Sequence, residues 1–235
     1  MRLGRISGSE PQYSRHMKRV RAESQSSELP RSFFARDTLT VSKELVGKVL
    51  VHRVPNIGEI ACIINETEAY NQDEASCHAF GGPSKRNAAM FKEGGHLYLY
   101  YIYGKNICLN FVTEQAGRGS AVLLRGVLPL RGTELLLTQG KSNKAKLLDG
   151  PAKLVKNMLI PMDYYGRDML EQECPLKIMD EGYEPEDLKT TTRIGISKAK
   201  ELEWRFVAKK FRQMAAPGKV EEQESEEEAS VEATN

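Results

Sequence analysis

The chain has 235 residues, of which 40% are hydrophobic and 28% are charged, so it holds enough apolar material for a sizeable globular core. No run approaches the roughly 18 consecutive apolar residues that a membrane-spanning helix needs, and the first residues lack the apolar centre of a secretion signal. We therefore expect a chain that is neither embedded in a membrane nor secreted.

The formal net charge of +2 conceals an uneven distribution of charge along the chain. Residues 219–235 contain seven Glu and one Lys, and the rest of the chain has 33 basic and 25 acidic residues, a net charge of +8. A basic body suits a polyanionic partner such as nucleic acid, although many soluble domains are mildly basic without binding one.

The two ends of the chain have the composition of disordered tails. Residues 1–30 form a basic tail without apolar periodicity, and residues 216–235 form an acidic one. The basic cluster at 18–21 fits a nuclear signal, a DNA-contacting arm, part of a mitochondrial presequence or a plain solvated tail. We expect a nuclear location in a eukaryotic source, with the mitochondrion as an alternative, and a cytoplasmic location otherwise.

Residues 31–215 are predicted to form one domain that begins with a short helix and a β-hairpin. Asp37 or Thr38 can cap a helix that runs through Leu45 and Val46, with Gly47 just past its end. Residues 48–53 and 59–69 have the pattern of strands, and residues 55–58 have the composition of the turn between them.

A long loop is predicted over residues 71–95, because glycine pairs and Pro83 interrupt any regular pattern there, with a helical turn near 87–91. A loop of that length inside a compact domain is usually functional or disordered, and its residue types favour function. Residues 97–103 and 107–112 are rich in apolar and aromatic side chains, which predicts a second β-hairpin with Tyr103 at its tip.

The later elements are shorter. Strands are expected at 120–127 and 176–179, and helices at 133–139 and 151–159, the second with Pro151 in its first turn. Residues 193–196 and 204–207 have the pattern of buried edges of the same core. The pattern as a whole indicates a domain rich in hairpins.

The four cysteines indicate free thiols. Their spacings contain no C-x-x-C pair and no paired histidine spacing, so a zinc site is not indicated and an intracellular chain is the simpler interpretation. The cysteines are Cys62, Cys77, Cys108 and Cys174.

The densest group of chemically active side chains lies between residues 66 and 110. On a strand, Glu66, Glu68 and Tyr70 share one face because strand side chains alternate. A carboxylate at the end of a strand, beside aromatic rings, can be the general base that activates a water molecule, or it can form an ordinary ion pair. Residue type alone does not separate these alternatives for Glu68.

Three aromatic or imidazole side chains in this segment, Tyr70, His78 and Tyr100, can sandwich a flat base lifted out of a nucleic-acid helix. The alternative is a tyrosine-rich core whose hydroxyls find local partners. An exposed Tyr103 can enter a minor groove as a wedge, or it can fold back onto the domain.

The basic side chains near these aromatic residues have two possible roles as well. Lys85, Arg86 and Arg125 can contact phosphates or hold an active-site carboxylate. Alternatively, Lys85 is surface charge and Arg125 forms a structural ion pair.

In order and spacing, these motifs resemble the alkyladenine (3-methyladenine) DNA glycosylases of mammals, plants and many bacteria, over about residues 32–207. No single motif is specific, but their succession is. The stretches that carry the resemblance are L-V-G at 45–47, E-T-E-A-Y at 66–70, D-E-A-x-x-H at 73–78, R-N-x-x-M-F at 86–91, Y-x-x-Y-G at 100–104, L-L-R at 123–125, G-P-x-K-L at 150–154 and R-I-G-I at 193–196.

The resemblance implies an α+β fold, a single mixed domain around a curved antiparallel β-sheet with a protruding β-hairpin. It implies no metal, no cofactor and no covalent lysine intermediate. Glu68 aligns with the catalytic general base, and Arg125 with the residue that helps to hold the water and Glu68. Tyr103 aligns with the side chain that enters the minor groove and fills the place of the extruded nucleotide.

The resemblance also assigns the pocket that receives the base. Tyr70, His78 and Tyr100 align with the side chains that stack on and recognise the flipped base, and Asn110 aligns with the residue that clashes with the 2-amino group of guanine. Contacts to the DNA backbone are expected from the basic stretch Lys85, Arg86 and Asn87.

The implied protein is a monofunctional DNA-3-methyladenine glycosylase of base excision repair, a monomer that acts on double-stranded DNA containing damaged purines, either alkylated or deaminated, such as hypoxanthine. Two alternatives are a module that flips and holds lesions without cleaving them, and a sugar hydrolase that uses Glu66 and Glu68 as a carboxylate pair. The presence of Glu68 argues against the first, and the basic body and Tyr103 argue against the second.

Overall fold

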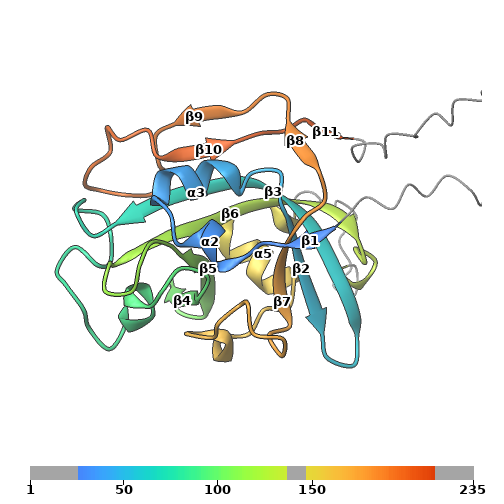
Figure 1. Ribbon diagram of the computed structural model, residues 1–235, viewed down its shortest axis with the longest axis horizontal. Coiled ribbons are helices and arrows are strands. Elements are labelled where there is room, and N and C mark those ends of the chain that lie inside the picture. Colours follow the sequence, from blue (N-terminus) through green and yellow to red (C-terminus); the bar gives the residue numbers. More distant parts are fainter. Residues whose placement is uncertain (1–25, 137–146, 215–235) are drawn as a thin grey trace, which may run out of the picture.

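The computed structural model describes residues 26–136 and 147–214. In these ranges the centre of the protein is a nine-stranded antiparallel sheet in which β1, β7, β2, β3, β6, β5 and β4 follow one another, while β10 pairs with β3 and β9 pairs with β10 (Figure 1). Its strands are β1 (Ser27–Glu28), β2 (Val49–Val54), β3 (Gly58–Asn71), β4 (Leu97–Ile102), β5 (Asn106–Val112), β6 (Ser120–Arg131), β7 (Leu176–Asp180), β9 (Lys189–Thr191) and β10 (Arg205–Val207).

The remaining elements are short, and the predicted α+β class, a single mixed domain, is confirmed. A two-stranded sheet pairs β8 (Tyr183–Pro185) with β11 (Phe211–Gln213). The helices are α2 (Arg31–Phe34), α3 (Thr38–Glu44) and α5 (Pro151–Asn157), with 3₁₀ turns η1 (Ala88–Phe91) and η3 (Met162–Tyr164).

Strand β3 is the long central strand on which the sheet is built. Its first half pairs with β2 as the predicted hairpin, from Val54 opposite Gly58 to Val49 opposite Ile63. Its second half pairs with β10, where Arg205 lies opposite Glu68, and β6 runs along its other edge. Glu68 therefore lies in the interior of the sheet, with a paired strand on each side.

Helix α3 begins where local chemistry predicts, but it ends at Glu44, before the predicted Leu45 and Val46, which lie in the turn that follows. The side chain of Asp37 accepts a hydrogen bond from the backbone N–H of Thr40 at 2.9 Å, which is an N-cap interaction. Gly47, just past the helix, has a φ of 100°, and a Cβ atom there would lie 2.5 Å from the carbonyl oxygen of Tyr183. Only glycine fits that position without displacing the backbone of its neighbour.

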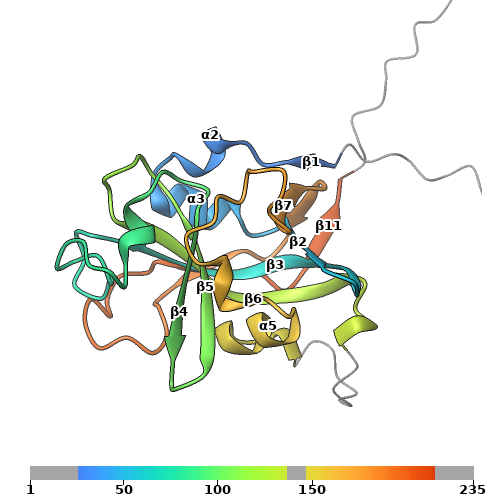
Figure 2. The same cartoon turned by 90° about the horizontal axis from the view of Figure 1, so that it is seen from below.

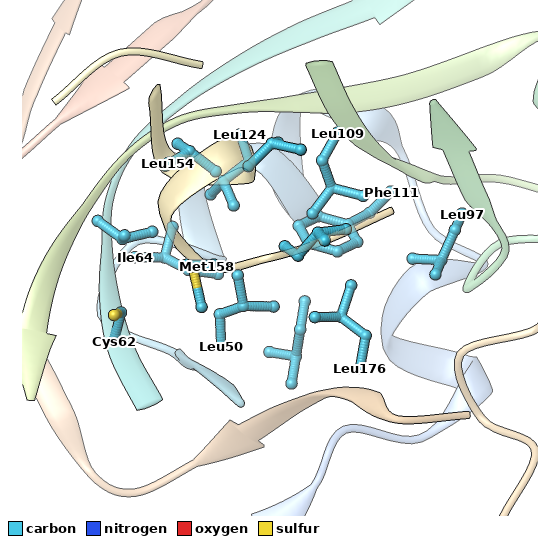
Figure 3. Packing of buried hydrophobic residues seen from close by; sticks show 14 of the residues in the cluster. Leu50, Cys62, Ile64, Leu97, Leu109, Phe111, Leu124, Leu154, Met158 and Leu176 are labelled. Atoms are coloured by element: carbon cyan, nitrogen blue, oxygen red, sulfur yellow. The ribbon is translucent and has the colours of Figure 1, made fainter. Parts of the chain in front are cut away.

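The main core lies between the sheet and the helices α2, α3 and α5, and Figure 3 shows part of it. Each fully buried leucine or phenylalanine of this cluster contributes about 1.5–3 kcal/mol through removal of its apolar surface from water. The labelled side chains come from β2 to β7, from α5 and from the residue just after α5, and they include Leu50, Ile64, Leu97, Leu109, Phe111, Leu124, Leu154, Met158 and Leu176.

Strands β4 and β5 form the second predicted hairpin. Leu97 lies opposite Phe111 at its base, and Ile102 lies opposite Asn106 at its far end, which leaves Tyr103 in the turn. Figure 2 shows this hairpin extending downwards, with α5 beside it.

Three expectations differ from the structure or fall partly outside it. Residues 193–196, predicted as a buried edge, form a loop in which Ile194 is exposed, whereas residues 205–207 do form a strand with Phe206 buried. Residues 27–28, which were predicted to belong to the disordered N-terminal tail, form strand β1 and pair with β7 in the sheet. The predicted helix at 133–139 lies partly outside the described residues, as does most of the N-terminal tail, and the acidic tail lies wholly outside them.

Candidate functional site

Glu68 lies beneath the candidate site, fully buried behind the side chains that line it, and we call this carboxylate the floor of the site. Its side chain has no exposed surface, and its two carboxylate oxygens have different partners. The backbone N–H of Ile194 donates to Oε1 at 2.8 Å, and the hydroxyl of Tyr70 donates to Oε2 at 2.7 Å. Arg125 Nε lies 3.3 Å from Oε1. Hydrogen bonds and an ion pair thus hold the carboxylate in one orientation.

A β-bulge brings Arg125 to this carboxylate. Glu66 is paired with Gly126 and Thr67 with Leu124, so Arg125 is the extra residue on β6 between two paired positions. Bulges often occur beside active sites, where they redirect a side chain. Here the redirected guanidinium lies within reach of two carboxylates on β3.

Glu66 acts as the main partner of the arginines on this face. Its Oε1 accepts hydrogen bonds from Arg125 Nε at 3.0 Å and from Arg205 Nη1 at 2.9 Å. The expected common face of Glu66, Glu68 and Tyr70 is consistent with these contacts. Because Glu66 has two cationic partners, it is suited to orienting Arg125.

A pocket of about 560 Å³ lies in front of Arg125, with Tyr70, His78 and Tyr100 in its wall. The size is within the range of small-molecule sites. The rings of His78 and Tyr100 meet edge to face with centroids 4.6 Å apart. The structure therefore brings together the three side chains that were predicted to hold a flat base.

Burial keeps the aromatic wall uncharged. Burial, and then the adjacent Glu68 carboxylate, raises the pKa of Tyr70, and burial and Cys108 raise the pKa of Tyr100. Partial burial of the ring, assisted by the positive charge of Arg86, lowers the pKa of His78 from 6.5. At neutral pH the wall consists of neutral phenols and a neutral imidazole.

Asn110 and Tyr98 form the inner wall on the hairpin. Asn110 is 4% exposed, lines the pocket, and donates its side-chain amide to the carbonyl oxygen of Tyr98 at 3.0 Å. The hydroxyl of Tyr98 in turn lies 2.8 Å from His78 Nδ1. Tyr98 was not predicted as a site residue, although the alternation of β4 places it on the same face as Tyr100.

Tyr103 stands at the mouth of the pocket and is 89% exposed. Its φ of 46° lies in the left-handed region, which is unfavourable for a bulky residue. Tyr101, 53% exposed on the same hairpin, also borders the mouth, and sequence reasoning did not single it out. The structure thus places two large rings where another molecule can contact them.

The predicted DNA-contacting residues at 85–87 divide into two kinds. Lys85 and Arg86 are exposed, and Arg86 borders the pocket. Asn87 is buried, and its amide nitrogen donates to the carbonyl oxygens of His78 at 2.8 Å and Gly82 at 3.0 Å. The side chain of Asn87 is therefore occupied in shaping the loop and is withdrawn from the expected phosphate contacts.

The loop at 193–199 completes the site and was missed as such. Arg193 is buried against Glu74, and Ile194 supplies the N–H that holds Glu68. The R-I-G-I motif marked the segment, but no local pattern reveals that a backbone amide there meets a carboxylate on β3. Together, the groups described can hold a flat ring between aromatic side chains, close to a buried carboxylate.

Comparison with known proteins gives this site a family. Residues 32–212 match the family model described as methylpurine-DNA glycosylase (MPG). A relative from Carboxydothermus hydrogenoformans is 41% identical over 182 residues, which cover 77% of this chain and 95% of the relative. One from Methanoculleus marisnigri is 39% identical, with 77% and 95% covered, and one from Agrobacterium fabrum is 40% identical, with 80% and 96% covered.

These relatives, bacterial and archaeal, carry provisional names as 3-methyladenine DNA glycosylases. The chain belongs to the methylpurine-DNA glycosylase family, and it is a DNA glycosylase of the 3-methyladenine type, a hydrolase of N-glycosyl bonds. Within the ranges that the structure describes, no helix is long and apolar enough to cross a membrane, and no group of three His, Cys, Asp or Glu side chains is arranged to hold a metal ion.

Proposed function

We propose that this protein is a base-excision-repair glycosylase that flips alkylated or deaminated purines out of duplex DNA and hydrolyses their N-glycosidic bond with a water molecule activated by Glu68. The observation that carries this proposal is the geometry of Glu68. A wholly buried carboxylate, held by a backbone amide, a phenol and an arginine, lies behind a pocket of neutral aromatic side chains.

The pocket wall favours alkylated purines that carry a positive charge. Tyr70, His78 and Tyr100 present π-faces or edges and are neutral at pH 7, since burial raises the already high pKa values of the phenols and partial burial lowers the pKa of the imidazole. A cation against such rings gains electrostatic stabilisation that a neutral purine does not. Extrusion also costs least for damaged or mispaired bases, which adds to selectivity.

In the reaction, Glu68 accepts a proton from water as the water oxygen bonds to the anomeric carbon of the nucleotide. The bond between that carbon and the base nitrogen breaks, and its electron pair leaves with the base. A positively charged purine becomes neutral on departure and needs no added proton. Hypoxanthine must be protonated before it leaves or as it leaves.

Access of water to Glu68 requires a local rearrangement, because the carboxylate has no exposed surface. Its two oxygens offer about four acceptor sites, of which two accept hydrogen bonds from Tyr70 and Ile194. Water can reach a remaining site when a small shift opens the pocket wall. We therefore expect DNA to bind first and the Glu68 carboxylate to become accessible to water afterwards.

Three further roles complete the proposal. Tyr103 fills the space of the extruded nucleotide, which explains an exposed ring on an unfavourable backbone conformation at the hairpin tip. Lys85 and Arg86 contact phosphates. Asn110, fixed by its hydrogen bond to Tyr98, excludes guanine by contact with the 2-amino group.

The catalytic domain corresponds to residues 31–215, and we propose that it acts as a monomer.

The alternatives are less well supported by the same geometry. In a sugar hydrolase Glu66 would act with Glu68 as a reactive pair, but Glu66 already accepts from two arginines. A binding module that does not cleave has no use for a carboxylate held behind its pocket.

Single-turnover excision from duplexes that each contain one lesion tests the proposal. When the lesion is an alkylated purine or hypoxanthine, we expect an abasic site to form in the strand that carried it, with the opposite strand intact. Free purine nucleosides and other glycosides should not be cleaved. Tight lesion binding without abasic sites would establish the binding module instead, and turnover of free glycosides without DNA would establish the sugar hydrolase.

A further inference from the structure

A buried ion pair between Arg193 and Glu74 joins two loops beside the pocket. Both residues are more than nine-tenths buried. The guanidinium binds both carboxylate oxygens, with Nη1 2.7 Å from Oε1 and Nη2 3.0 Å from Oε2. A buried pair of this kind often stabilises a fold no more than apolar side chains of the same size would, so its main contribution is the fixed geometry of a two-point contact.

Arg193 contacts the surroundings of Glu68 without contacting Glu68 itself. Its Nη1 donates to the carbonyl oxygen of Ala69, the next residue along β3, at 3.0 Å. Its guanidinium carbon lies 4.6 Å from the centre of the Tyr70 ring, whose hydroxyl donates to Glu68. Its successor in the chain, Ile194, provides the N–H that donates to the other oxygen of Glu68.

The guanidinium is enclosed from several directions. The centre of the Trp204 ring lies 5.2 Å from its central carbon, and Nη2 donates to the carbonyl oxygen of Ala199 at 3.3 Å. Arg193 Nε is the one buried side-chain nitrogen or oxygen of the described residues that lacks a hydrogen-bond partner. An unpaired buried N–H is unfavourable, so the position of this side chain is set by its other contacts.

Glu74 extends the connection into the 71–79 loop. Its Oε2 also accepts from the backbone N–H of Ser76 at 2.7 Å, and the hydroxyl of Ser76 donates to the carbonyl oxygen of Lys198. Ser76 and Lys198 both line the pocket. The two loops that border the pocket are therefore joined at two points, and Arg193 with Glu74 is the buried one.

We propose that Arg193 and Glu74 are positioning residues for the excision step, and that they set the orientation of the Glu68 carboxylate through the Ile194 N–H and the Tyr70 hydroxyl. This role rests on the proposed function of Glu68 as general base. Neither Arg193 nor Glu74 lines the pocket. The pair therefore acts on the rate of bond cleavage from the bound state and leaves the affinity for lesion DNA nearly unchanged.

The variant Arg193→Lys tests the role, because lysine keeps the charge but lacks the planar fork and the stacking surface. We expect the single-turnover excision rate to fall on the order of 10- to 100-fold, as for small misplacements of reacting groups. The dissociation constant for lesion duplex should change by less than about threefold. If Arg193 had only a structural role, Arg193→Lys would lower thermal stability, and its excision rate and its affinity for lesion duplex would not change by such different factors.

Arg118→Lys is the matched control. Arg118 also joins the 71–79 loop to another segment, through Asp73 and Glu114, but it contacts neither Tyr70 nor Ile194. The Arg118→Lys variant should excise the lesion at the wild-type rate.

Glu74→Gln is a second test of the role. It keeps the shape of the Glu74 side chain and weakens the ion pair with Arg193, so it decides the matter if Arg193→Lys does not fold.

Each outcome has a defined meaning. Wild-type rates for folded Arg193→Lys and Glu74→Gln, or equal losses of rate and binding, overturn the positioning role. If Glu68→Gln in the same assay is inactive while both variants are fully active, only the positioning role fails. If Glu68→Gln excises at the wild-type rate, the proposed function of Glu68 fails, and the positioning role fails with it.

Discussion

The floor of the site, which is the buried Glu68 carboxylate behind the pocket, and the tip of the β4–β5 hairpin have opposite surroundings. Glu68 has no exposed surface and has partners on both carboxylate oxygens, whereas Tyr103 is 89% exposed and lies in a turn of unfavourable φ. A group that must react in one orientation benefits from a rigid setting prepared in advance. A group that must enter another molecule has to be presented, and it contributes free energy only in the complex. Changes at the floor should therefore affect rate, and changes at the tip should affect binding.

The largest effect is expected at the floor. Glu68→Gln cannot accept the proton of water but keeps the size of the side chain, so excision should fall on the order of a hundred- to ten-thousand-fold while lesion binding is retained. Glu66→Gln is the control, and it should lose less because Glu66 acts through Arg125. Single-turnover excision and equilibrium binding measure both. A Glu68→Gln rate within a few-fold of wild type would remove Glu68 from the role of base.

The second effect is expected at the tip. Tyr103→Ser should weaken lesion binding by about 1–3 kcal/mol, as for the loss of a base-sized stacking contact, with little change in thermal stability. Tyr98→Ser in the same hairpin is the contrasting variant. Tyr98 is 1% exposed, so its truncation should cost about 3–5 kcal/mol of folding stability. A large loss of stability in Tyr103→Ser with unchanged base flipping would make Tyr103 a core residue.

The third effect concerns selectivity at the inner wall, between floor and tip. Asn110→Ser removes the amide that faces the pocket, so the excision of normal guanine relative to hypoxanthine should rise by about tenfold or more. Release of each base from matched duplexes gives this ratio. An unchanged ratio would place the discrimination against guanine elsewhere in the pocket.

A smaller effect is expected on the salt dependence of DNA binding. If Arg86 contacts a phosphate, Arg86→Gln should reduce the slope of log affinity against log salt by about one. Arg212→Gln serves as the control, because Arg212 is exposed on β11 and pairs with Glu184. Equal slopes for Arg86→Gln and wild type would mean that Arg86 does not contact the backbone.

The smallest effect is expected from pH. The pKa of His78 is lowered by burial and by Arg86, so the imidazole stays neutral as the pH falls to about 6.5 and gains its charge only at lower pH. Binding of a cationic purine should be constant above that point and weaken below it, since a protonated His78 repels the base. Affinity measured from pH 5 to 8 checks this. His78→Gln should abolish the decline at low pH, and persistence of the decline would assign it to another group.

The parts of this structure that depend on neighbours in sequence were predictable. The cap of α3 at Asp37 follows from residue type, and the common face of Glu68 and Tyr70 follows from alternation on one strand. The hairpin with Tyr103 in its turn follows from two β-rich runs that flank a Tyr–Gly pair.

Long-range contacts were not predictable in the same way. Arg193 and Glu74 are 119 positions apart, and the bulge that directs Arg125 depends on the register between β3 and β6. The apolar Ile194 suggested a buried edge, yet its side chain is exposed while Arg193 is buried, because the ion pair and backbone contacts of Arg193 determine the path of the loop. Asn87 was expected to face DNA because of its basic neighbours, but its amide satisfies backbone carbonyls inside the loop.

The division of labour between floor and tip is tested most directly by following base flipping and excision together, on one duplex that contains a fluorescent lesion base. Wild type, Glu68→Gln and Tyr103→Ser are compared under single-turnover conditions. We predict that Glu68→Gln flips the base to the wild-type extent without releasing it. Tyr103→Ser should flip a smaller fraction and release that fraction at the wild-type rate. If both variants impair the same step, either flipping or release, the account of a catalytic floor and a DNA-entering tip is contradicted.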